Sequence, residues 1–132
     1  MKISRSAYER IIEHAQQDMP LEACGYLGGE DGTVVEAWCL KNIDQSGEHF
    51  SFDPKEQFRT VVAMRAKNQR AVAVYHSHPE TPARPSQEDI RLAFDPEMIY
   101  VIVSLAAAEP EVKAFRIVKE EVAEESLDII DG

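Results

Sequence analysis

The stretch Ala71-Val-Ala-Val-Tyr-His-Ser-His-Pro-Glu-Thr-Pro-Ala-Arg-Pro-Ser-Gln-Glu-Asp89 organises the chain. Residues 71–75 are apolar at every position, as expected of a central strand that helices cover on both faces. The strand runs into His76 and His78, and because side chains of an extended backbone alternate, both imidazoles point to one side. A loop stiffened by three prolines follows, and Asp89 lies in the first turn of the next predicted helix. Two imidazoles and one carboxylate suit zinc and leave a fourth position for water.

Each part of this pattern also has a structural explanation. A His-x-His pair alone is weak support for a metal site, since most such pairs are surface or packed residues. Ser86 and Asp89 fit a capping box, and a carboxylate near a helix N-terminus is favourable without any metal. The combination of two histidines at a strand end, a stiff loop and a carboxylate at a helix start favours the metal site.

The rest of the chain predicts a mixed β-sheet flanked by helices, an α/β arrangement with α+β character. A capping signal at Ser6–Glu9 precedes a helical apolar period. Asp53-Pro54 opens a second helix, and a short third helix is predicted from 86 to 94. Apolar or alternating runs predict the strands, at residues 23–27, 33–40, 71–75, 98–105 and 112–118.

Composition and charge argue against nucleic-acid and membrane partners and indicate the cellular compartment. The chain has 132 residues and a net charge of -10, which argues against nucleic acid, because that affinity rests on Lys and Arg, and weakly against an anionic membrane. It has no apolar run of about 20 residues and no apolar block typical of a signal peptide. The two cysteines, Cys24 and Cys39, show no CxxC spacing. A reduced, cytoplasmic location is the predicted one.

The spacing of the central motif resembles a known signature. Two histidines one residue apart, seven residues, Ser86, two residues and Asp89 resemble the motif of JAMM (MPN-plus, Mov34/JAB-like) zinc metallopeptidases. Glu22–Gly29 and Phe50–Pro54 are similar to the short prokaryotic branch of that family. The resemblance implies a JAB/MPN, cytidine-deaminase-like αβα fold. It also implies one catalytic domain at residues 1–118, followed by an acidic segment, 119–132, that is docked or disordered.

The resemblance implies a role for each matching residue. His76, His78 and Asp89 would ligate one zinc ion per chain. Glu22 would be the general base and would return its proton to the leaving amine, a task that suits a carboxylate near a cation. Ser86 would hydrogen-bond the developing oxyanion or the water. Spacing alone does not assign Glu22, whose ordinary interpretation is a solvated residue at a helix–strand junction.

The short branch is associated with ubiquitin-like sulfur carriers that end in Gly-Gly. The resemblance therefore implies hydrolysis of an amide bond after that Gly-Gly, which releases an amino acid such as cysteine or trims the tail, with the carrier as partner. An isopeptidase that removes such a modifier from protein lysines is the alternative. A non-enzymatic scaffold would be expected to lack the ligands, and a nucleoside deaminase would need a Pro-Cys-x-x-Cys segment, which this chain lacks.

Other reactive side chains receive structural interpretations. His14 and His49 are expected to be solvated, and Cys24 is expected to be a packed thiol. Ser77 points away from its histidine neighbours and is expected to be structural, and Trp38 is assigned to the core.

Overall fold

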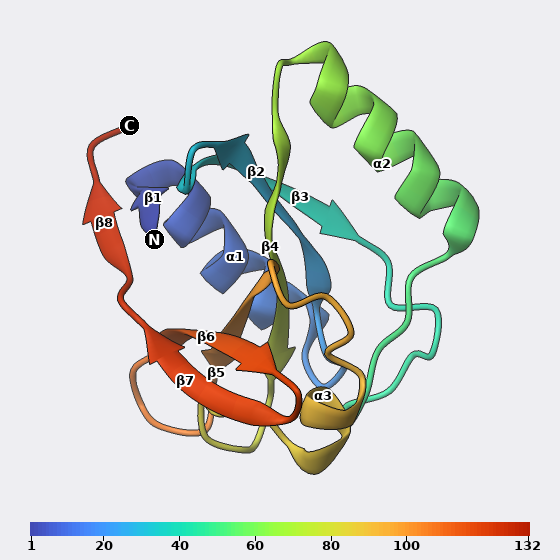
Figure 1. The fold of residues 1–132 in the computed structure, drawn as a ribbon. Coiled ribbons are helices and arrows are strands. Elements are labelled where there is room, and N and C mark those ends of the chain that lie inside the picture. Colours follow the sequence, from blue (N-terminus) through green and yellow to red (C-terminus); the bar gives the residue numbers. More distant parts are fainter.

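The computed structural model describes residues 1–132 and has an eight-stranded mixed sheet with three helices (Figure 1). The strands are β1 (Lys2–Ser4), β2 (Cys24–Glu30), β3 (Thr33–Leu40), β4 (Arg70–His78), β5 (Ile99–Ser104), β6 (Glu111–Val118), β7 (Glu121–Glu125) and β8 (Asp128–Ile130). The helices are α1 (Arg5–Asp18), α2 (Pro54–Ala66) and α3 (Gln87–Arg91). The predicted mixed sheet with flanking helices is confirmed.

The strand order is β7-β6-β5-β4-β2-β3-β1-β8. β4 pairs in parallel with β5 and antiparallel with β2, so this strand lies inside the sheet as its apolar sequence predicted. Its neighbours position its last residues, because His76 pairs with Cys24 on one side and with Ile102 on the other.

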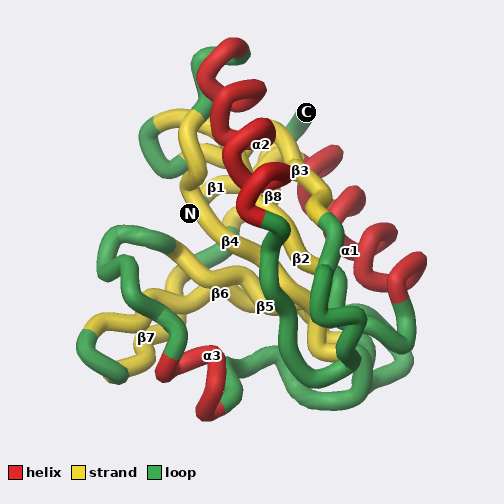
Figure 2. The backbone as a smooth tube through the Cα atoms, turned by 90° about the vertical axis from the view of Figure 1, so that its right-hand side faces the viewer, coloured by secondary structure: helices red, strands yellow, loops and turns green.

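The long helices α1 and α2 cover opposite faces of the sheet. Ile11 of α1 packs in one apolar cluster with Leu27 of β2, whereas Met64 of α2 packs with Tyr26 of the same strand. Because consecutive strand residues point to opposite faces, the two helices must lie on different sides, and β3 passes between them in Figure 2. None of the three helices combines the length and apolar character that crossing a bilayer requires.

Two local predictions in α1 are wrong. The helix is capped by Ser4 rather than Ser6: Ser4 has an extended backbone at the end of β1, and its Oγ accepts a hydrogen bond from Ala7 N at 3.2 Å. His14 is buried rather than solvated. Its Nδ1 lies 2.7 Å from the Tyr75 hydroxyl and its Nε2 lies 3.1 Å from an Asp18 carboxylate oxygen, so polar partners compensate its burial.

The acidic C-terminal segment contributes strands at both edges of the sheet. β7 pairs antiparallel with β6, and β8 pairs in parallel with β1 at the opposite edge. The chain reaches from one edge to the other through Ser126 and Leu127, as the red end of the ribbon shows in Figure 1. The start of β8 also holds Met1, since the Met1 carbonyl accepts a hydrogen bond from Asp128 N at 2.9 Å.

Candidate active site

Three potential metal ligands meet at the C-terminal end of β4. His76 and His78 are both buried, and α3 brings the carboxylate of Asp89 to them. The two Nε2 atoms lie 3.1 Å apart, and each lies 3.1 Å from Asp89 Oδ2. The structure thus brings together all three residues that the motif singled out as ligands.

The spacing of these three atoms fits a tetrahedral metal. Zinc bonds of 2.0–2.1 Å at tetrahedral angles place neighbouring ligand atoms about 3.3 Å apart. The triangle formed by His76 Nε2, His78 Nε2 and Asp89 Oδ2 has sides of 3.1 Å, close to that value. Its donor set of two imidazoles and one carboxylate occurs in catalytic zinc centres and leaves one coordination position open.

Surrounding groups fix the two imidazole rings. His78 Nδ1 lies 2.9 Å from the carbonyl oxygen of Pro82. Because a carbonyl can only accept, Nδ1 carries the hydrogen and a neutral His78 presents its Nε2 lone pair to the site. Phe50 stacks on His76, with ring centroids 4.9 Å apart and planes at 26°. The proline loop and the Phe50 ring therefore orient the ligands.

Ser86 and Asp89 form the capping box at the start of α3, and Asp89 also reaches the two histidines. Ser86 N donates to Asp89 Oδ2 at 2.9 Å, and Asp89 N donates to Ser86 Oγ at 3.0 Å. The two interpretations of this sequence are compatible, because one geometry caps α3 and aims the carboxylate at the histidines. Since Ser86 Oγ acts as an acceptor in this bond, its hydroxyl hydrogen remains free to donate elsewhere.

Asp89 and His78 stabilise each other's ionised forms. Burial alone would raise the pKa of Asp89, but hydrogen bonds from His76 and His78 outweigh burial and hold that pKa well below its usual range. Burial alone would lower the pKa of His78, yet its bonds to Asp89 and to the Pro82 carbonyl raise it. Asp89 therefore stays a carboxylate beside the imidazoles at neutral pH.

Strand pairing brings Glu22 to the same place. Ala23 N donates to Ser77 Oγ at 2.7 Å, and Ser77 N donates to the Ala23 carbonyl at 2.9 Å. This pair of bonds places Glu22 next to the segment that carries both histidines, and it confirms Ser77 as a structural residue. Glu22 is only 3% exposed and its Oε1 has no hydrogen-bond partner. Burial raises the pKa of Glu22 to about 8.

Asn42 organises the loop that covers Glu22. Its side-chain amide donates to the carbonyls of Glu22 at 3.1 Å, Ser46 at 3.3 Å and His49 at 3.0 Å. Its Oδ1 accepts from Asp44 N and Ser51 N. No sequence signal marks a buried amide within this loop, because the partners of Asn42 are backbone groups.

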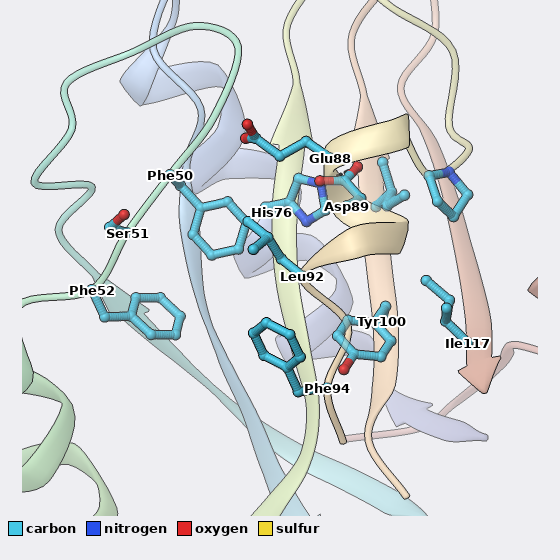
Figure 3. A pocket seen from close by; sticks show the side chains of 12 residues that line it. Phe50, Ser51, Phe52, His76, Glu88, Asp89, Leu92, Phe94, Tyr100 and Ile117 are labelled. Carbon is cyan, nitrogen blue, oxygen red and sulfur yellow. Dashed lines mark hydrogen bonds and ion pairs between the residues drawn. The ribbon is translucent and has the colours of Figure 1, made fainter. Parts of the chain in front are cut away.

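An apolar cavity of about 270 Å³ opens beside the ligands (Figure 3). His76 and Asp89 form part of its wall. The apolar side chains that line it are those of Phe50, Phe52, Pro85, Leu92, Phe94, Tyr100, Ile102 and Ile117. We refer to this cavity as the aromatic pocket. Sequence reasoning missed it, because its walls come from segments that are adjacent only after the sheet has formed.

The other reactive side chains considered in the sequence take no part in the site. Cys24 is buried, with its thiol 3.9 Å from the Leu40 carbonyl, and burial raises its pKa to about 12, so it is the packed thiol that was predicted. His49 is exposed, as expected. Trp38 is partly buried and donates to Gln69 at 2.8 Å.

Comparison with known proteins agrees with this geometry. Residues 4–118 match the family described as prokaryotic homologs of the JAB domain. Over 124 residues the chain is 34% identical to the CysO-cysteine peptidase of Mycobacterium tuberculosis, covering 92% of this chain and 85% of that protein. A desampylase of Haloferax volcanii is 32% identical over 111 residues, covering 79% of this chain and 80% of that protein. A solved structure from Desulfitobacterium hafniense has 46% identity and a TM-score of 0.91, covering 99% of this chain and 93% of that one.

Proposed function

The chain belongs to the prokaryotic JAB-domain family, and from this premise we propose that it is a zinc-dependent peptidase acting on a ubiquitin-like sulfur carrier. The bond cleaved is the amide bond after the carrier's C-terminal Gly-Gly, and the product is an amino acid such as cysteine or a trimmed tail. One relative is named as a peptidase for CysO-cysteine and another as a desampylase, and both names describe hydrolysis of a bond to a small carrier or modifier.

The observation that carries the proposal is the unpartnered carboxylate oxygen of Glu22. A buried polar atom without a partner is rare in folded proteins, and this one lies close enough to the triangle of candidate ligand atoms for His78 and Asp89 to influence the Glu22 carboxyl. His76, His78 and Asp89 would hold the zinc ion. When bound there, zinc supplies a Lewis acid that polarises the scissile carbonyl and makes water nucleophilic near pH 7. A water molecule positioned for attack would also satisfy Glu22 Oε1.

Glu22 then transfers the proton, and Ser86 stabilises the developing negative charge. Glu22 takes a proton from the attacking water and later gives it to the leaving amine. Its burial suits this exchange, because an apolar environment brings the carboxyl pKa close to neutral. Ser86 has a free hydroxyl hydrogen and donates it to the developing oxyanion. Asn42 and Ser77 hold the peptide unit that follows Glu22, since the Asn42 amide donates to the Glu22 carbonyl and Ser77 Oγ accepts from Ala23 N.

We place the catalytic machinery in residues 1–118, with 119–132 completing the sheet edges. The alternative function, removal of a modifier from protein lysines, is less well supported. The match to the CysO-cysteine peptidase covers 92% of the chain, against 79% for the desampylase.

The experiment compares two substrates by intact-mass spectrometry. One is a carrier with cysteine appended after Gly-Gly, and the other is the same carrier joined to a lysine side chain. We expect the zinc-loaded protein to release cysteine faster than lysine. Glu22→Gln should keep its zinc and lose hydrolysis, whereas His78→Ala should lose zinc by elemental analysis. Turnover by a zinc-loaded Glu22→Gln protein, or no cleavage of either carrier, would overturn the proposal.

A further inference from the structure

The aromatic pocket leaves large apolar side chains in contact with water next to the ligands. Phe94 is 81% exposed and Leu92 is 52% exposed, while Ile102 and Ile117 form a buried floor. Exposed apolar surface lining a concavity marks a binding site for apolar groups. Figure 3 shows Phe50 beside His76, with Phe94 and Tyr100 farther along the pocket.

The pocket and Glu22 lie on different sides of His76. His76 and Asp89 line the pocket, but Glu22 and His78 do not. Because β2 is antiparallel to β4 and Cys24 pairs with His76, Glu22 precedes that pair and lies toward His78. Tyr100, in contrast, pairs with Val74, two residues before His76 on β4. The pocket therefore extends back along the sheet, away from Glu22.

This arrangement orients a substrate. The leaving amine must lie toward Glu22, because that carboxyl returns the proton to it. The acyl part of the scissile amide then points the other way, toward the aromatic pocket. In an extended chain, two glycines span about 7 Å, and without side chains they pass closely between the Phe50 ring and Asp89. The residue before Gly-Gly is the first whose side chain can enter the pocket.

We propose that the aromatic pocket binds the side chain of the residue that immediately precedes Gly-Gly, and that it selects an apolar residue there. The inference rests on the proposed function, since it names the tail sequence that this same site accepts. An acidic side chain at this position would lose its hydration among aromatic rings and would meet the carboxylate of Glu88, which also lines the pocket.

The test uses three carriers that differ only in having Leu, Ala or Asp before Gly-Gly, each with the same cysteine appended. We expect kcat/KM to fall at least tenfold from Leu to Asp, in line with the discrimination that apolar pockets achieve. Leu92→Lys should slow the Leu carrier and speed the Asp carrier. Phe58→Lys, on the exposed surface of α2 and outside the pocket, is the matched control and should leave the preference unchanged.

Equal kcat/KM for the three carriers would overturn the inference, and so would a Leu92→Lys protein that slows all three by the same factor. If no carrier is cleaved, the proposed function fails, and peptide binding still tests the pocket. Peptides ending in Leu-Gly-Gly should then bind more tightly than those ending in Asp-Gly-Gly by fluorescence anisotropy, and equal affinities would refute the pocket assignment.

Discussion

Replacing Glu22 with Gln should stabilise the metal-free protein at neutral pH, although it removes the proposed general base. Burial raises the pKa of Glu22 to about 8 in the folded protein, against 4.5 for an ordinary glutamate. The folded state therefore binds a proton that the unfolded state has released. The stability that this carboxyl contributes is fully present below pH 4.5 and is lost as pH rises through about 8.

The size of the effect follows from this difference. Each pH unit between the two pKa values lowers the free energy of unfolding by about 1.4 kcal/mol. At pH 7 the loss is therefore roughly 3 kcal/mol, a large share of the stability of a domain of this size. Gln keeps the shape of the side chain and does not titrate. The free energy of unfolding of Glu22→Gln should therefore not fall in this pH range.

The assay is urea denaturation of chelator-treated protein at pH 5, 6, 7 and 8, followed by circular dichroism. The difference in unfolding free energy between Glu22→Gln and the parent should grow by about 3 kcal/mol from pH 5 to pH 8. Glu9→Gln, at an exposed position on α1, is the control and should show no such growth. Added zinc should shrink the Glu22 difference, because a nearby cation favours the carboxylate. Parallel pH profiles for Glu22→Gln and the parent would refute the reasoning.

Three further predictions concern single side chains. Burial lowers the pKa of His14 despite the opposing charge of Asp18, so the folded state excludes a proton that the unfolded state binds. The free energy of unfolding should therefore fall as pH drops below about 6.5. In urea titrations, His14→Gln should flatten this pH dependence. Asn42→Ala leaves several backbone groups unpaired and should lower the free energy of unfolding by about 1–3 kcal/mol in denaturant melts. It should also lower kcat at unchanged zinc content. An unchanged kcat would contradict the positioning role of Asn42. Ser86→Ala removes the α3 cap and should lower the free energy of unfolding by about 1 kcal/mol and kcat by about 100-fold. Asp53→Ala, which removes the α2 cap, should lower stability by a similar amount and leave kcat intact.

Local sequence patterns predicted the parts of the site that are close in the chain. The apolar run 71–75 and the spacing of His76, His78 and Asp89 suffice for a strand, a loop and a helix start that bring three ligand atoms together. The capping box at Ser86 is equally local. These features depend on backbone periodicity and short-range hydrogen bonds, which single-sequence reasoning can follow.

Features that depend on long-range pairing could not be predicted in the same way. Glu22 reaches the site only because Ala23 and Ser77, 54 residues apart, exchange hydrogen bonds, and its proposed role came from family resemblance alone. Asn42 acts on backbone carbonyls that no sequence pattern identifies. His14 looked solvated because its partner Tyr75 lies 61 residues away. The true α1 cap, Ser4, was missed because β1 places it at the correct extended geometry.

The interior position of β4 constrains inhibitors of this site. β2 and β5 already pair with the main chain of β4 on both sides, and the free edges of the sheet belong to β7 and β8. A compound that reaches His76 must therefore lie across the face of the sheet and cannot extend it as an added strand. Medicinal chemistry directed here gains little from mimicking peptide amides along β4. Against the proposed zinc peptidase, it gains from a metal-chelating group joined by a slim spacer to a lipophilic substituent.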